Sequence, residues 1–128
     1  MTTKLIYNSD LHFEHVQWKK ELLFWKDEIK SFQNRIKDII VRWTDEQVLA
    51  ELGQFQHDFG QEEHQINEFI VEIEEHEDNI SKHLKEHEDC IDRVFLKHHE
   101  RFRDNLSSER DIYSNLKHRF YNFLTKYL

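Results

Sequence analysis

The chain of 128 residues contains no proline, and its two glycines are Gly53 and Gly60, so almost nothing in it interrupts a helix. Sheets and barrels need turn-forming residues at regular intervals, whereas long helices exclude proline and glycine from their interiors. Charged residues make up 34% of the chain and aromatic residues 13%, which supplies both a solvated surface and bulky side chains for a core. The composition therefore predicts an all-α fold.

The length suits one domain, with an N-terminal tail over residues 1–9 and a single helical-bundle domain over residues 10–128. The favoured arrangement is an antiparallel bundle of four helices. These are predicted at about residues 10–43, 45–77, 80–106 and 108–127.

The first predicted helix has an apolar seam with alternating three- and four-residue steps, which favours packing against a partner helix. Its members are Leu11, Trp18, Leu22, Trp25, Ile29, Phe32, Ile36, Ile39 and Trp43. His15 fills the one gap in this seam, and Ser9 or Asp10 is the expected N-cap. Thr44 and Gln47 have the spacing of a capping box, so the second helix should begin after a tight turn.

The second seam consists of Val48, Leu52, Phe55, Phe59, Ile66, Phe69 and Ile73, with Glu62 in one seam position. The two glycines inside it predict close approach of a neighbouring helix or, less favoured, an irregular stretch. Ser108 and Asp111 have capping-box spacing and predict the start of the last helix. Its expected seam is Ile112, Leu116, Phe120, Phe123 and Tyr127.

Two nearly identical hexapeptides, EHEDNI at 75–80 and EHEDCI at 86–91, leave the central topology open. Their offset is close to three helical turns, so one helix could run from about 45 to 106. That alternative gives three helices with one very long central helix, and such a protein would dimerise to cover its seams. A turn between Asp78 and Ser81 is favoured instead, because helices of about 60 residues are rare.

The charge is strongly segregated, which limits the classes of partner. Residues 44–92 contain sixteen acidic and two basic side chains, whereas residues 93–128 contain four acidic and eight basic ones. An acidic centre repels phosphate backbones, so no nucleic-acid partner is expected. The one cysteine, Cys90, fits a reducing compartment, and no segment is apolar enough for a signal peptide or membrane span. A cytoplasmic location without a membrane partner is predicted.

The ten histidines are the feature that suggests chemistry. His64 precedes Glu68 by four residues, His83 precedes His87 by four, and His99 precedes Asp104 by five. In this order HxxxE, HxxxH and HxxxxD resemble the ligand pattern of hemerythrins, four-helix proteins that hold two irons. His87 and His99 share one expected helix, so membership of that family is not predicted.

We therefore expect a non-enzymatic helical bundle that acts through a protein partner or self-association, with a homodimer as one form. No catalytic residue, cofactor-binding residue or cofactor is predicted. The alternative is a metal-binding bundle of hemerythrin-like or di-iron type. Its candidate ligands are His64, Glu68, His83 and His87.

Overall fold

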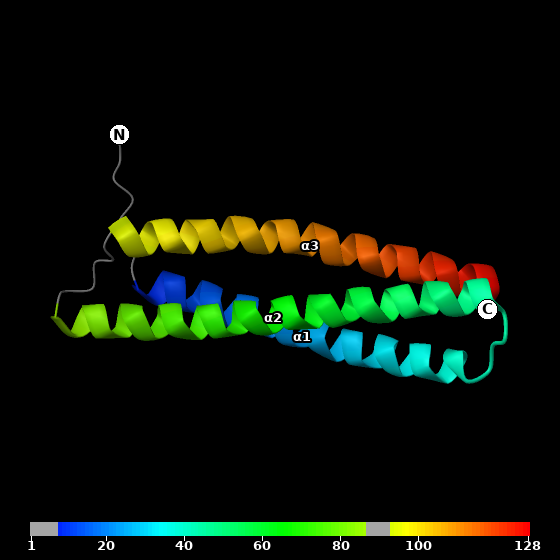
Figure 1. The fold of residues 1–128 in the computed structure, drawn as a ribbon. Coiled ribbons are helices and arrows are strands. Elements are labelled where there is room, and N and C mark those ends of the chain that lie inside the picture. The colour runs from blue at the N-terminus through cyan, green and yellow to red at the C-terminus, as the bar shows by residue number, and fades with distance from the viewer. Residues whose placement is uncertain (1–7, 87–92) are drawn as a thin grey trace.

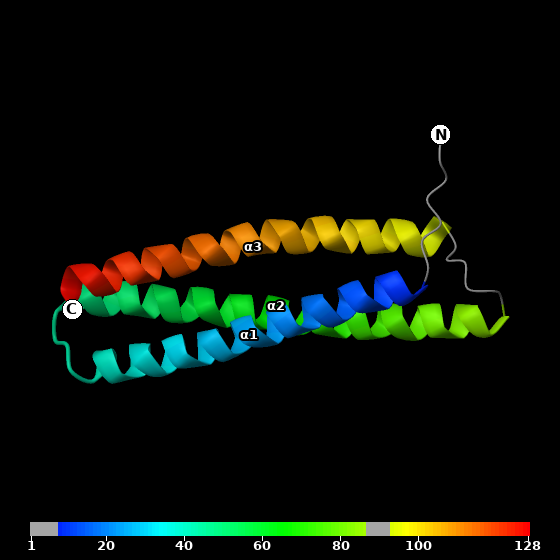
Figure 2. The ribbon, with the colours of Figure 1, turned by 180° about the vertical axis from the view of Figure 1, so that it is seen from behind.

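A computed structural model describes residues 8–86 and 93–128. These residues form three α-helices, α1 (Asn8–Ile40), α2 (Glu46–Glu86) and α3 (Arg93–Tyr127). α2 runs antiparallel to α1, and α3 runs parallel to α1 (Figure 1). The view from behind shows one elongated bundle, in which the end of α3 lies beside the start of α2 (Figure 2). The all-α prediction is confirmed.

The predicted count of four helices is wrong for the described part of the chain. α2 continues through Asp78 and Asn79, where the sequence predicts a turn. Ile80 is only 1% exposed, so the apolar seam extends past these residues. Asp78 forms an ion pair with Lys82, 3.1 Å away on the next turn. The turn-forming side chains thus lie on the exposed face, and packing of the seam decides the conformation.

α3 likewise continues through Ser107 and Ser108, which sequence reasoning assigned to a helix boundary. Its buried seam keeps three- and four-residue steps across this point and consists of His99, Phe102, Leu106, Glu109, Tyr113, Leu116, Phe120 and Phe123. Ile112, predicted to lie in the seam, is 53% exposed, and Tyr113 takes its place. Tyr113 follows Leu106 by two helical turns, so an unbroken helix turns it inward.

The three-helix alternative has the right number of helices but places them wrongly. The predicted helix over 45–106 is divided, because α2 ends at Glu86 and α3 begins at Arg93. The second EHED hexapeptide falls almost entirely outside the described residues. α1 also ends earlier than predicted, at Ile40 instead of residue 43.

A side-chain cap starts α2. Oδ1 of Asp45 accepts hydrogen bonds from the backbone N–H groups of Gln47 at 2.9 Å and Val48 at 3.1 Å. Asp45 therefore performs the capping role predicted for Thr44. The glycine predictions are wrong as well, since Gly53 and Gly60 are exposed within regular helix and an added Cβ would meet nothing within 4 Å.

The core is formed by the predicted seams of α1 and α2 together with the seam of α3. Aromatic rings fill it, including Phe59 and Phe120, whose centroids are 5.2 Å apart. The polar faces of the helices remain exposed. None of the described helices combines the length and the apolar character that crossing a membrane requires.

Three ion pairs join α1 to α3 at regular intervals. Glu14 pairs with Arg103 at 2.7 Å, Glu21 with Arg110 at 2.9 Å, and Glu28 with Lys117 at 3.2 Å. Both sets of residues repeat every seven positions, so the pairs lie two turns apart along the parallel helices. We call them the ion-pair ladder. It holds α3 alongside α1.

Candidate metal centre

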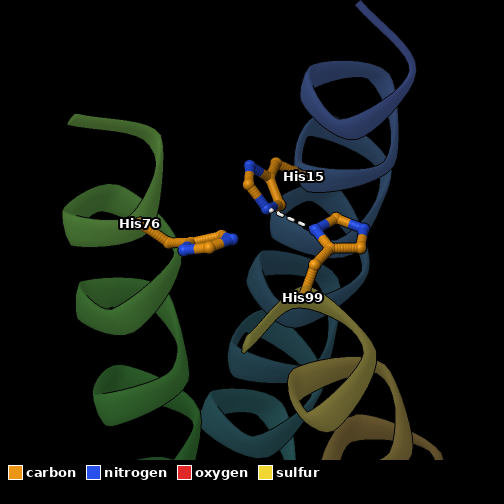
Figure 3. Close-up of side chains that lie close together, drawn as sticks. All are labelled: His15, His76 and His99. Atoms are coloured by element: carbon orange, nitrogen blue, oxygen red, sulfur yellow. Dashed lines mark hydrogen bonds between the residues drawn. The ribbon is translucent and has the colours of Figure 1, made fainter. Parts of the chain in front are cut away.

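Three histidines occupy the seams of the three helices at one level of the bundle. In α1, His15 fills the seam gap; in α2, His76 follows Ile73 by three residues; in α3, His99 precedes Phe102 by three. This spacing turns each side chain inward. His15 is 2% and His99 0% exposed, whereas His76 is half-buried. We call His15, His76 and His99 the histidine layer (Figure 3).

The rings of the histidine layer are close enough to share one ligand. One nitrogen of each ring lies within 4.8 Å of a nitrogen of the other two. Nε2 of His15 and Nδ1 of His99 are 3.1 Å apart. Nε2 of His76 is buried and has no hydrogen-bond partner in the part of the chain that the structure describes. Figure 3 shows the ring of His76 reaching from α2 toward the other two.

Carboxylates hold the outer nitrogens of the two most buried rings. Nδ1 of His15 donates to Oε1 of Glu77 at 2.5 Å, and Nε2 of His99 donates to Oε1 of Glu14 at 2.6 Å. Arg103 binds both oxygens of Glu14, with its Nε 2.8 Å from Oε2 and its Nη2 2.7 Å from Oε1. These hydrogen bonds fix which nitrogen of each imidazole carries its proton.

Both carboxyl groups are ionised at neutral pH. Burial acts to raise the pKa of Glu14, but hydrogen bonds from Arg103 and His99 outweigh it and lower that pKa. Burial likewise acts to raise the pKa of Glu77, and hydrogen bonds from His12 and His15 lower it. An ionised carboxylate can only accept, so the outer nitrogens must be the donors.

The three imidazoles are neutral at pH 7. Burial lowers the pKa of His15 and of His99, against the opposing effects of Glu77 and Glu14. Burial, followed by the charges of His15, His99 and His98, lowers the pKa of His76 to about 4. A neutral imidazole has one N–H, which His15 and His99 use toward their carboxylates. Their inner nitrogens, Nε2 of His15 and Nδ1 of His99, lie within hydrogen-bond distance of each other at 3.1 Å (Figure 3).

An aromatic layer packs against one side of the histidine layer. The ring of Trp18 stacks on His99, with centroids 4.7 Å apart and planes inclined by 30°. Trp18 also contacts Phe102, with centroids 5.0 Å apart, and Phe102 meets Phe69 edge-on at 5.3 Å. The low dielectric of such surroundings strengthens any charge interaction made by the imidazoles.

A cavity of about 290 Å³ borders the histidine layer. His15 and His76 form part of its lining. Its other lining residues are Glu72, Ile73, Glu75, Asn79, Val94, Phe95, His98 and Phe102. The layer is thus enclosed by aromatic rings and also accessible to a small molecule.

Two of the four candidate ligands chosen from sequence are described, and they lie outside this layer. Nε2 of His64 is 3.1 Å from Oε1 of Glu68 on the surface of α2, with side chains 77% and 60% exposed. His83 belongs to α2, but its side chain lies outside the described residues, as does His87 altogether. The two described candidates, His64 and Glu68, are therefore exposed and not part of the histidine layer, and the prediction for His83 and His87 stays a prediction.

Sequence reasoning placed His15 in the seam of the first helix but did not connect it with His76 and His99. The signal was present, because each seam contains one histidine at a position that its spacing assigns to the core. Connecting the three requires the correct positions of the turns. If the chain turned near residue 79, as predicted, His76 would lie close to that turn and His99 far from it, so the two would not meet at one level.

A second polar layer lies further along the bundle. Glu62 of α2 and Glu109 of α3 are 8% and 9% exposed, and we call them the carboxyl layer. Burial, then a hydrogen bond with Glu109 and the charge of Glu109, raise the pKa of Glu62 to about 8. Oε2 of Glu62 is buried without a hydrogen-bond partner among the described residues. Glu62 therefore keeps a proton at neutral pH, and this proton lets it hydrogen-bond with the neighbouring carboxyl group of Glu109.

Comparisons with known proteins identify no relative of this chain. No family matches the sequence, and no curated protein and no solved structure is significantly similar to it. The chemistry of the histidine layer is therefore the guide to function.

Proposed function

We propose that the protein binds one divalent transition-metal ion in the histidine layer. The observation that carries this proposal is the convergence of three imidazole nitrogens, one from each helix. The inner nitrogens of His15 and His99 are within hydrogen-bond distance of each other at 3.1 Å, and Nε2 of His76 is buried nearby without a hydrogen-bond partner among the described residues. A buried nitrogen without a partner is costly, and a cation bound among the three rings would satisfy it.

The carboxylates behind the rings support the same proposal. Metal-binding histidines commonly donate their second N–H to a carboxylate, which orients the ring and increases its basicity. His15 has Glu77 in this role, and His99 has Glu14. Both rings are thus held in the tautomer that a metal ion requires.

The geometry suits a tetrahedral ion such as Zn²⁺. Metal–nitrogen distances of about 2.1 Å place tetrahedral ligands about 3.4 Å apart. The inner nitrogens of His15 and His99 are already near that separation, at 3.1 Å. His76, whose nitrogen lies within 4.8 Å of the others, must approach by no more than about 1.4 Å. Its side chain is half-buried and has room for this movement.

A mononuclear site is better supported than the di-iron alternative. Dinuclear iron sites in helical bundles use several carboxylates as direct ligands. Among the described residues, the group whose atoms converge contains three histidines and no carboxylate. The nearby Glu14 and Glu77 are instead engaged with the outer ring nitrogens.

The metal ion would connect all three helices near the end of the bundle where α2 ends and α3 begins. Because an ion that binds only the folded state stabilises it, zinc would also strengthen the bundle at this level. It would hold α3 in place at the end opposite to the aromatic contacts of Phe59 and Phe120.

Calorimetric titration of the full chain with Zn²⁺, combined with native mass spectrometry, tests the proposal. We expect one ion per chain. His76→Leu should weaken binding by about a hundredfold or more, because it removes one of three ligands. It should also leave the metal-free fold at least as stable, since it removes a buried nitrogen that has no partner.

His64→Leu is the matched control, because His64 is on the same helix but exposed. It should bind Zn²⁺ like the original chain. Equal affinities for the His76→Leu and His64→Leu variants, or no zinc binding by the original chain, would contradict the proposal.

Self-association is a second candidate function, favoured by the outer face of α1. Phe13 and Phe24 are 66% and 61% exposed on that face, eleven residues or three turns apart. A second copy packed antiparallel would place Phe13 of each chain against Phe24 of the other, which gives a two-fold homodimer. Large exposed aromatic side chains at one face are typical of such contacts.

Sedimentation equilibrium tests this candidate with the double variant Phe13→Ser, Phe24→Ser. We expect the original chain to dimerise at micromolar concentration and the variant to be monomeric. Ile112→Ser changes an apolar residue on α3 that is 53% exposed and should leave the dimer intact. A monomeric original chain at about 100 μM would remove this candidate.

A further inference from the structure

The coordination of a metal ion by the histidine layer would be incomplete. This inference rests on the proposed function, because it concerns the ion that His15, His76 and His99 would hold. Three protein ligands leave one position of a tetrahedral ion free, and sites of this kind bind water or an exogenous molecule there. What can reach the free position depends on the surroundings of the layer.

The histidine layer has aromatic residues on one side and a cavity on another, and a small molecule can reach it from the side of the cavity. Trp18 stacks against His99 and, with Phe102, fills the space next to the rings. The cavity of about 290 Å³ instead has His15 and His76 in its lining, while His99 is not among its lining residues. A molecule inside the cavity would therefore approach the ion between the rings of His15 and His76.

The lining of the cavity determines which molecule fits. Ile73, Phe95 and Phe102 provide an apolar wall, whereas Glu72 and Glu75 bring two carboxylates to it. The carboxylate of Glu77, which holds His15, adds further negative charge close by. A small anion would be repelled by these groups, but a neutral molecule with a flat apolar body would not.

We propose that the metal centre keeps its fourth coordination position for a small neutral molecule with a nitrogen donor, which enters through the cavity between α2 and α3. The donor atom binds the ion, and an aromatic or apolar body packs against Phe95 and Phe102. Imidazole is the simplest probe of this class. Azide, an anion of similar size, is the matched probe for the role of charge.

Visible absorption of the full chain loaded with Co²⁺ tests the proposal, since the bands of this ion respond to a change of ligand. At about pH 8, where imidazole is neutral, we expect imidazole to shift the bands and to bind about tenfold or more tightly than azide. The double variant Glu72→Gln, Glu75→Gln should strengthen azide binding about threefold or more and leave imidazole binding unchanged.

A variant that narrows the cavity tests the route. Asn79 is an exposed lining residue of α2, and Asn79→Phe should weaken imidazole binding about tenfold while Co²⁺ affinity remains the same. Ser81→Phe is the control, because Ser81 is exposed on the same helix but outside the lining. Its imidazole affinity should match that of the original chain.

The outcomes separate the two proposals. If Co²⁺ does not bind, the proposed function fails and this inference fails with it. If Co²⁺ binds but imidazole leaves the bands unchanged, only the open coordination position is refuted. Azide binding as tight as imidazole would refute selection by charge, and equal imidazole binding by the Asn79→Phe and Ser81→Phe variants would refute the cavity as the route.

Discussion

The histidine layer and the carboxyl layer both place polar groups in an apolar core, but they differ in where the protons of those groups lie. His15 and His99 direct their outer N–H groups to ionised carboxylates, and their inner nitrogens lie 3.1 Å apart. Glu62 instead keeps its own proton, because burial and the neighbouring Glu109 raise its pKa to about 8. The first layer can be completed by a cation, whereas the second is complete when it carries one proton. Burial alone does not determine what a polar group binds; the partners on its outer side do.

The largest expected effect is stabilisation by zinc, which should involve the histidine layer alone. At a free Zn²⁺ concentration of about a thousand times the dissociation constant, the free energy of unfolding should rise by about 4 kcal/mol. Thermal unfolding followed by circular dichroism measures this. Glu62→Gln should respond like the original chain. His76→Leu should gain no more than about 1.4 kcal/mol, because at a hundredfold weaker affinity the same zinc concentration is only about ten times its dissociation constant. A similar zinc response in the His76→Leu variant would mean that the ion binds elsewhere.

The carboxyl layer should give the next largest effect, through pH. The pKa of Glu62 is raised from 4.5 to about 8, so the folded state retains a proton that the unfolded state releases between these values. Its contribution to stability is fully present below about pH 4.5 and is lost as the pH rises through about 8. Glu62→Gln keeps a neutral donor at this position and should remove the dependence.

We expect the Glu62→Gln variant to be more stable than the original chain by about 1–3 kcal/mol at pH 8.5 and equal to it near pH 4.5. Urea unfolding at several pH values measures the difference. Glu68→Gln, at an exposed position of the same helix, should follow the original chain throughout. If the Glu62→Gln and Glu68→Gln variants showed the same pH profile, the carboxyl layer would hold no proton.

A third prediction separates metal affinity from helix pairing. Glu14→Gln removes the carboxylate behind His99 and should weaken Zn²⁺ binding about 10- to 100-fold, which is typical for the loss of such a partner. Glu21→Gln breaks the next rung of the ion-pair ladder without touching a histidine, and Zn²⁺ affinity should not change. Both variants should lose no more than about 1 kcal/mol of metal-free stability, because the pairs are partly exposed. Equal Zn²⁺ affinity in the two variants would assign Glu14 to the ladder alone.

The smallest effect comes from the glycines of α2, which belong to neither layer. Gly53→Ala and Gly60→Ala place a Cβ in open space within regular helix and should each stabilise the fold by about 1 kcal/mol. Zinc affinity and the pH profile should stay as they are. A change in zinc affinity or in the pH profile would mean that these properties depend on the stability of α2 in general. They could then no longer be assigned separately to the histidine layer and the carboxyl layer.

Local pattern was sufficient to predict the apolar seams but not where the chain turns. The seam of α1 from Leu11 to Ile39 follows from spacing alone, because consecutive positions on one helix are related by fixed geometry. Asp78, Asn79 and Ser108 have turn or cap preferences of about 1 kcal/mol, and seam burial exceeds these preferences. An error in the turns shifts the level of every later residue. For this reason the individual histidines were visible in sequence, while their meeting in one layer was not.

The regular spacing of the ion-pair ladder has a consequence for alternative alignments of the bundle. If α3 slid along α1 by seven residues, Glu14 would meet Arg110 and Glu21 would meet Lys117, so two rungs would form again. The ladder therefore scarcely opposes slippage of α3 along α1. In the slipped alignment His15 would lie level with Leu106 instead of His99, and its inner nitrogen would face a hydrocarbon. The histidine layer and the carboxyl layer therefore determine the alignment of the bundle, because the observed position of α3 brings the buried polar groups of both layers together.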